Sequence, residues 1–297
     1  MFSDLITTFE YYPLSFYLTV FVVALTIGSF LNVVIYRFPK MLEQGWYQEC
    51  REFLADELKD TPIKAKNEQV ITLSKPNSTC PHCQHQIRYY ENIPIISWLF
   101  LKGKCSQCKT AISIRYPIIE GATAVLSLVV ALQYGVAPIT FYVLILTWGL
   151  ICLTMIDFDH MLLPDQFTYP LLWLGLLINI NATIVPLEQA VIGAVAGYMS
   201  LFSVFWLFKL ITGKEGMGHG DFKLLAVFGA WMGWQLLPLL ILMASAVGAI
   251  IGISLMLFKN HSREQAIPFG PYLAIAGWIC LLWGEGIWQW YLALILT

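Results

Sequence analysis

The sequence predicts an all-α polytopic membrane protein with about eight transmembrane helices and one cytoplasmic segment between the first and second. Hydrophobic residues make up 58% of the chain and charged residues 12%, and the mean hydropathy is +0.68, far from the balance of a soluble domain. Apolar stretches recur at about the 20-residue length that crosses roughly 30 Å of hydrocarbon. The basic residues also gather on one side of these stretches.

The apolar stretches predict the spans one by one. They are residues 14–36, 117–135, 138–156, 167–185, 189–208, 222–234, 236–258 and 269–295. The sixth is short and abuts the seventh at "WMGWQLLP", so it is a tilted or partial helix, or part of a re-entrant unit. No basic stretch precedes the first span and no small-residue cleavage signal follows it, so we expect a retained anchor rather than a signal peptide.

The positions of the 17 Lys and Arg residues predict the orientation. Twelve lie in residues 37–116, and the other five lie in or beside the loops that the predicted topology puts on the same side. Because short cytoplasmic loops retain basic residues, segment 37–116 should face the cytoplasm and both termini the periplasm. We expect three parts: an anchor (1–36), a cytoplasmic segment (37–116) and a multi-helix membrane domain (117–297). The bilayer is a partner, and we expect no nucleic acid.

Four cysteines in the cytoplasmic segment predict a metal site. "CPHC" supplies Cys80 and Cys83, "CSQC" supplies Cys105 and Cys108, and 21 residues separate the two pairs. Four thiolates at this spacing close a tetrahedral shell on a structural zinc ion. Two disulfides are the alternative, which a reducing cytoplasm disfavours. His82 and His85 could substitute as ligands, although four thiolates already complete the set. We expect Cys50, Cys152 and Cys280 to be free thiols or small apolar fillers.

Three aspartates cluster in "MIDFDHMLLPDQFTYP" (residues 155–170), where the third span ends. Asp157 is nearest the bilayer, and an ionisable group at an embedded helix end is costly and therefore a functional candidate. Asp159 is a second candidate. Asp165 follows Pro164 just before the fourth span and is expected to act as the N-cap of that helix.

Asp221 has the same character in "MGHGDFKLLA" (residues 217–226). The preceding "GMGHG" lacks side chains at three of five positions, so its backbone can approach a substrate or another helix closely. A simple flexible turn is the alternative, and a phosphate-binding P-loop is disfavoured because the Lys-Ser/Thr pair is missing.

Two aspartates at cytoplasmic helix ends suggest one chemistry above others if they meet. Repulsion between two carboxylates keeps one protonated while its partner is ionised. The ionised group can then take a proton from a water molecule while the protonated group donates to a peptide carbonyl. This arrangement predicts an aspartic protease.

The motifs together resemble a known family. "GHGD" at residues 218–221 is similar to the GxGD signature of intramembrane aspartic proteases. With "IDFDHMLLPD", the CxxC pairs, "GSFLNVVIYR" at residues 28–37 and "RYPIIE" at residues 115–120, the chain closely resembles the type IV prepilin peptidases along nearly its whole length. By that resemblance the catalytic pair is Asp157 and Asp221.

The resemblance implies a bifunctional enzyme of the bacterial inner membrane. Such an enzyme cuts prepilins and type II secretion pseudopilins after a glycine at the cytoplasmic face and then methylates the new N-terminal residue with S-adenosylmethionine. The methyl-transfer site carries no recognisable fingerprint. Glu43, Glu49 and Arg51, or the "GSFLNVVIYR" stretch, are candidates by location only, and for each of them fold support or a solvated surface is the favoured role.

Two further features of the sequence leave alternatives open. Glu120, near the inner end of the second span, is either a structural partner of Arg115 or a partner for a substrate charge. "IPFGPYLAIAG" (residues 267–277) is either a helix start with Pro in its first turn or a loop that lines the active site.

Two other classes of function also remain at this stage. A proton-coupled transporter uses intramembrane aspartates as relays, but these carboxylates gather at one face and no inverted repeat is evident. An inactive zinc-bearing scaffold is the third class.

Overall fold

The computed structural model describes residues 2–54, 71–259 and 267–296. Every regular element in this part of the chain is a helix, and the only pairing of extended residues is two isolated bridges, Thr79 with Gln86 and Lys104 with Ala111. The predicted all-α class is therefore confirmed. The chain divides into two compact units, residues 1–129 and 130–297, and each is described by itself.

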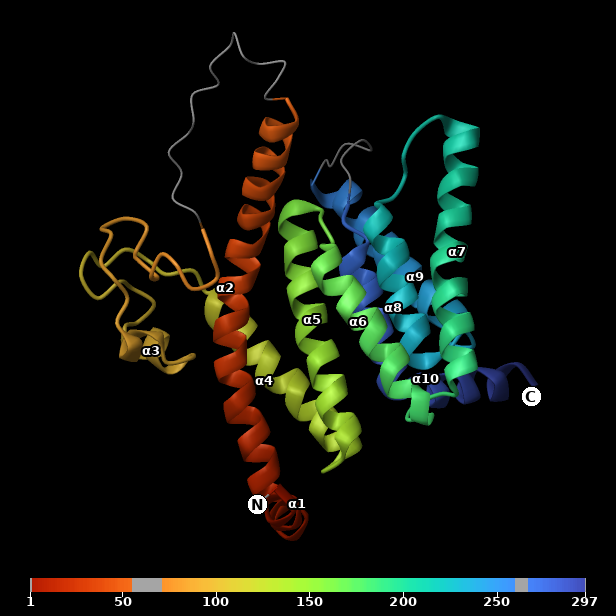
Figure 1. The fold of residues 1–297 in the computed structure, drawn as a ribbon, viewed down its shortest axis with the longest axis horizontal. Helices are drawn as coiled ribbons and strands as arrows, with labels where there is room; N and C mark the ends of the chain where they lie inside the picture. Colours follow the sequence, from red (N-terminus) through yellow and green to blue (C-terminus); the bar gives the residue numbers. More distant parts are fainter. Residues whose placement is uncertain (1, 55–70, 260–266, 297) are drawn as a thin grey trace. The chain divides into compact units, whose positions relative to one another are not determined.

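The first unit contains the long helices α2 and α4 together with shorter helical elements (Figure 1). Its elements are α1 (Phe2–Tyr11), α2 (Pro13–Phe53), the 3-10 turn η1 (Tyr89–Asn92), α3 (Ile96–Phe100) and α4 (Arg115–Tyr134), whose end enters the second unit. Helix α2 continues past the predicted span 14–36 and contains Pro39. Residues 55–70 of the predicted cytoplasmic segment lie outside the described residues.

Helices α2 and α4 approach closely at a glycine. A Cβ built on Gly28 would lie only 2.8 Å from the Cα of Glu120, so a larger residue would force the helices apart. One turn along α2, the side-chain amide of Asn32 donates to the backbone oxygen of Tyr116 at 3.2 Å. These contacts attach the start of α4 to the middle of α2.

The second unit is a bundle of helices. Its elements are α5 (Pro138–His160), α6 (Asp165–Ile178), the 3-10 turn η2 (Asn179–Asn181), α7 (Leu187–Thr212), α8 (His219–Met232), α9 (Leu237–Lys259) and α10 (Gly270–Leu296). Helix α8 contacts α6, α7, α9 and α10, and Figure 1 shows it among these neighbours. The bundle is therefore organised around α8.

Helix α8 corresponds to the predicted sixth span and is short, as expected. It has 14 residues, ends at Met232 and is followed by Gly233, whose φ of +76° few other residues adopt. Apart from Lys223, all residues from Asp221 to Met232 are buried. A helix that is apolar on all sides is a core helix.

Close helix contacts explain how α8 is enclosed. A Cβ on Gly229 would collide with the backbone of α7 at Gly193, and one on Gly197 would lie 2.6 Å from the carbonyl oxygen of Leu225. Gly193 and Gly197 stand four residues apart, the small-xxx-small spacing of closely packed membrane helices. On the α6 side, the fully buried Trp231 donates from its indole to the Leu171 carbonyl at 2.8 Å.

Five helices in the described part of the chain are long and apolar enough to cross a membrane. They are α2, α4, α5, α7 and residues 237–254 of α9. The polytopic membrane character is therefore confirmed, while the count of eight spans stays a prediction. Helices α6 and α8 have 14 residues each, short of the roughly 20 that a full crossing needs.

Candidate functional site

Asp157 lies one turn before the end of α5, on the buried side of that helix. The side chain is only 5% exposed, whereas Asp159 and His160 point outward and are exposed. Residues two apart on a helix face different directions, which explains the contrast between the two aspartates. Helix α5 ends at Met161, which adopts the left-handed conformation and turns the chain toward α6.

Asp221 lies in the first turn of α8 and is also 5% exposed. Gly218 occupies the N-cap position, and its backbone N–H hydrogen-bonds to the Asp221 carboxylate. A carboxylate in the first turn of a helix also faces the positive end of the helix dipole. The Gly-rich sequence before α8 thus supports the carboxylate through its backbone.

The structure brings the surroundings of these two aspartates together. Leu163, in the α5–α6 loop, lies against both Gly220 and Gly270. Gly220 is the neighbour of Asp221, and a Cβ built on it would be 2.6 Å from Leu163 Cβ. Gly270 is at the start of α10, and a Cβ built on it would be 3.1 Å from Leu163 Cδ1. The same Cβ on Gly270 would lie 2.5 Å from Asp157 Oδ2. The two carboxylates are close enough to interact electrostatically.

Both carboxylates keep an unused oxygen. Asp157 Oδ2 and Asp221 Oδ1 are buried, and neither has a hydrogen-bond partner in the described part of the chain. Buried polar atoms are almost always satisfied in folded proteins, so an exception needs an explanation. Two such atoms on interacting carboxylates are suited to hold a water molecule or a substrate group.

Asp165 does not act as the expected N-cap. Pro164 occupies the N-cap position of α6, and no side chain caps this helix end. Instead Asp165 accepts a 2.6 Å ion-pair hydrogen bond from Lys223 of α8, whose ammonium also lies 5.2 Å from the ring centre of Tyr169. The pair joins the first residue of α6 to the helix that carries Asp221.

The four cysteines of the CxxC pairs converge as predicted. Their sulfur atoms all lie within 4.8 Å of one another, with Cys80 and Cys108 3.7 Å apart and Cys83 and Cys105 3.9 Å apart. Tetrahedral zinc with bonds of about 2.3 Å places its thiolate ligands about 3.8 Å apart. All four are free thiols, so the structure does not contain the alternative disulfides, and the cluster suits a metal such as zinc.

Local turns shape each cysteine pair in the same way. The residue after the second cysteine has a positive φ in both, 58° at Gln84 and 60° at Lys109, and its N–H donates to the carbonyl of the first cysteine. Thr110 hydrogen-bonds to the sulfur of Cys108 and lowers the pKa of this thiol to about 6. A thiol that ionises readily is a better metal ligand.

His85 does not join the cysteine cluster. Its Nε2 lies 3.3 Å from Glu91 Oε2, and the Arg88 backbone N–H donates to the same oxygen at 2.9 Å. The Arg88 N–H is the largest cause that lowers the pKa of Glu91. His85 thus has a partner other than a metal, in agreement with a four-thiolate set.

Glu120 has a structural partner. Its Oε2 accepts the backbone N–H of Ile95 at 2.7 Å, and Ile95 has a φ of +57° that the rest of the fold must stabilise. Among the two readings of the sequence, this contact favours a structural role, because the carboxylate attaches the segment before α3 to α4.

The sequence did not predict the roles of three residues near the aspartates, Lys223, Leu163 and Gly270. Lys223 served only as an indicator of topology, although a lysine in an apolar helix is itself a signal. Leu163 carried no signal. Gly270 lies in the segment whose role as an active-site loop was left open, and the structure places it against Asp157 as the first residue of α10, with Pro271 second.

Comparison with known proteins identifies relatives along nearly the whole chain. The Bacterial Peptidase A24 N-terminal domain matches residues 22–134, and the type IV leader peptidase family matches residues 144–253. The two matches contain the cysteine cluster and both buried aspartates, respectively.

Several curated relatives have the name prepilin leader peptidase/N-methyltransferase. The protein of Aeromonas salmonicida is 56% identical and the alignment covers 96% of each chain. That of Pseudomonas aeruginosa is 54% identical over 95% of each chain, and that of Legionella pneumophila is 43% identical over 95% of this chain and 96% of its own. No solved structure matches the chain.

Proposed function

The chain belongs to the type IV leader peptidase family, and on this basis we propose that it cleaves the leader of type IV prepilins and pseudopilins and N-methylates the new N-terminal residue. The protein is a protease and a methyltransferase, and it is a multi-pass membrane protein like its relatives. The relatives lend no support to a proton-coupled transporter or an inactive scaffold, the two alternatives that the sequence left open.

Asp157 and Asp221 are the catalytic pair in this proposal. The observation that carries it is the pair of buried oxygens without partners on two interacting carboxylates from different helices. Asp159 is excluded from the pair because it is exposed, and Asp165 because it is engaged by Lys223.

The pair performs hydrolysis without a covalent intermediate. One carboxylate is ionised and the other protonated, because two adjacent negative charges repel. The ionised group removes a proton from a water molecule as the water oxygen bonds to the scissile carbonyl carbon, and the protonated group donates its proton to the carbonyl oxygen. The C–N bond then breaks as the leaving nitrogen takes the proton that the first carboxylate gained, and the second carboxylate recovers its proton from a hydroxyl group of the intermediate to leave the carboxylic acid product.

The remaining parts of the proposal concern location and cofactors. The active site lies at the cytoplasmic face of the bacterial inner membrane and both termini are periplasmic, as the basic residues predict. The division into an anchor (1–36), a cytoplasmic segment (37–116) and a membrane peptidase domain (117–297) belongs to the same proposal. Zinc organises the cysteine segment, and its role is structural because four thiolates leave no ligand position open.

S-adenosylmethionine supplies the methyl group in this proposal. Glu43, Glu49 and Arg51 lie on the exposed C-terminal part of α2, and their position beyond the predicted first span is all that supports them as candidates. The distances and contacts in the structure therefore support the proposed cleavage site and not a methyl-transfer site.

The test is a carboxamide series. Asp157→Asn and Asp221→Asn should each lower prepilin cleavage by at least about a hundredfold, because an amide keeps the shape of the carboxylate but cannot exchange the proton. The double variant should be no worse than either single one. Asp159→Asn, on the same helix but exposed, is the matched control and should cleave normally. Substantial cleavage by either buried-site variant would refute the aspartic mechanism.

A further inference from the structure

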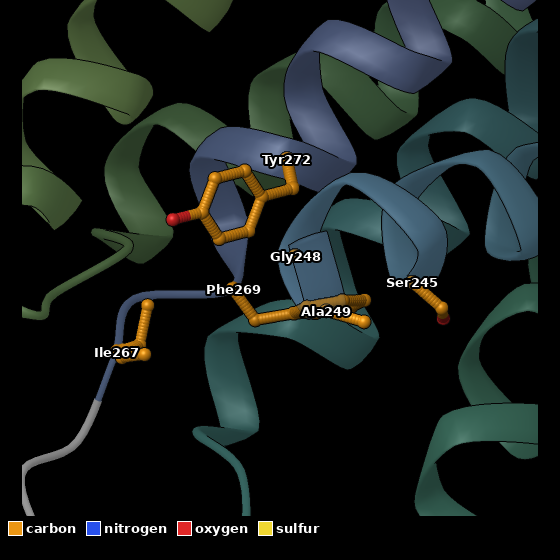
Figure 2. Close-up of a pocket in the computed structure, with 6 residues that line it drawn as sticks. All are labelled: Ser245, Gly248, Ala249, Ile267, Phe269 and Tyr272. Carbon is orange, nitrogen blue, oxygen red and sulfur yellow. The ribbon is translucent and has the colours of Figure 1, made fainter. Parts of the chain in front are cut away.

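A pocket of about 260 Å³ lies between α9 and the start of α10. Its walls are formed by Ser245, Gly248, Ala249, Ile267, Phe269 and Tyr272, and we call it the α9–α10 pocket (Figure 2). The α9 wall consists of three small residues, whereas the α10 side supplies three large ones. Figure 2 shows the hydroxyl of Tyr272 directed away from Ser245, so the space between the walls is mainly apolar.

The small residues of α9 create the hollow. A Cβ built on Gly248 would lie 3.3 Å from the Tyr272 ring, so even one added methyl group would narrow the space. The volume is below the roughly 300–1,000 Å³ typical of pockets for whole small molecules. The pocket therefore suits a single large apolar side chain.

The position of the pocket connects it to the aspartates. Gly270, whose backbone N–H hydrogen-bonds to the Asp157 carboxylate, stands between two of the lining residues, Phe269 and Tyr272. Consecutive Cα atoms are about 3.8 Å apart, so the pocket begins within one or two residues of the carboxylate. A peptide whose scissile bond lies at the aspartate pair can therefore place a neighbouring side chain in this region.

We propose that the α9–α10 pocket binds a large apolar side chain of the prepilin, on a residue that flanks the scissile bond. The inference rests on the proposed function and adds a specificity determinant to it. Burial of such a side chain removes apolar surface from water and positions the bond at the carboxylates. A lipid acyl chain is the competing occupant, and the experiment below separates the two.

The experiment pairs a filled pocket with a substrate series. Ala249→Leu fills the pocket, and prepilins are prepared with Leu or Ala at the second residue before the cleavage site and at each of the two residues after it, while the glycine directly before the site is kept. Cleavage by the wild type should prefer Leu at one of these positions by about tenfold, the discrimination that a hydrophobic pocket supplies for a few methylene groups. Ala249→Leu should abolish this preference at that position alone.

A matched control and a milder variant protect the interpretation. Ala246→Leu is the same substitution on the same helix at an exposed position outside the pocket, and it should keep the wild-type preference. Gly248→Ala narrows the pocket by one methyl group and should reduce the preference without removing it. This variant provides the test if Ala249→Leu fails to fold.

The outcomes are distinct. Loss of the preference at one flanking position supports the pocket, because residues that share a contact or a cavity couple, whereas distant, independent sites contribute additively. An equal loss of rate with every substrate, or an unchanged preference, overturns it and leaves lipid or no ligand as the occupant. If the wild type cleaves no prepilin at all, the proposed function fails and the pocket assignment with it, whereas normal wild-type cleavage without coupling refutes the pocket alone.

Discussion

Replacing Gly270 with alanine should slow leader cleavage far more than it destabilises the protein. The new Cβ would lie 2.5 Å from Asp157 Oδ2 and 3.2 Å from Asp157 Cγ. Ordinary contact begins at 3.4 Å, so the carboxylate must retreat by about 0.9 Å. A misplacement of about 1 Å at a reacting group costs on the order of a hundredfold in rate.

The stability of Gly270→Ala should change little. The group that must move is the end of a side chain rather than backbone, so the cost should stay near the lower end of the roughly 1–3 kcal/mol seen for overpacking. Part of this cost is offset because alanine restricts the unfolded chain, which contributes about 0.4–1 kcal/mol. We therefore expect a protein that melts close to the wild type but cleaves slowly.

The assay is steady-state cleavage of a full-length prepilin in proteoliposomes, together with the melting temperature of the same preparation. Gly286→Ala is the matched control on the same helix, because a Cβ there meets no atom within 4 Å in the part of the chain that the structure describes. It should cleave and melt like the wild type. Wild-type cleavage by Gly270→Ala would show that the start of α10 does not constrain Asp157 and would refute the reasoning.

The remaining predictions concern the metal, the ion pair and the core. Cys80→Ser with Cys105→Ser should reduce zinc, measured by elemental analysis, from one ion per chain to none while the helical circular dichroism of the spans persists; unchanged content would refute the site. Lys223→Met and Asp165→Asn should each slow prepilin cleavage modestly, because the partly exposed ion pair contributes about 1 kcal/mol or less. Exchanging the two residues should restore part of the cleavage rate, and equal activity in all variants would contradict a positioning role. Gly229→Ala should destabilise the detergent-solubilised protein by at least about 1–3 kcal/mol in a denaturation experiment, because the backbone of α7 leaves no room; an unchanged midpoint would contradict the packing.

Features that depend only on residues close together in the sequence were predictable. Apolar runs must form helices in a bilayer, because every backbone group needs a partner within the chain. Each CxxC pair likewise brings two sulfurs together within a single turn. The all-α class and the cysteine cluster followed from such local rules, and Asp157 and Asp221 stood out because charged groups are rare in apolar helices.

The helix starts were predicted to within a few residues, but the C-terminal ends of α2 and α6 and the roles of individual side chains were not. Asp165 was expected to be an N-cap because it begins a helix, and the structure pairs it with Lys223, 58 residues away. No local pattern distinguishes these two roles. The competing partner became decisive only when α6 and α8 packed against each other.

The sequence by itself thus determined the candidates for chemistry in this protein: four cysteines at metal-ligand spacing and two aspartates near helix ends. Only the tertiary structure decided their surroundings, namely that Leu163 fills the space between Gly220 and Gly270, and that Gly270 touches Asp157 from the start of another helix. The physical reason is that these contacts form where glycines allow two helices to approach closely. Which helices approach at which glycine depends on the packing of the whole bundle rather than on the spacing of residues along one helix.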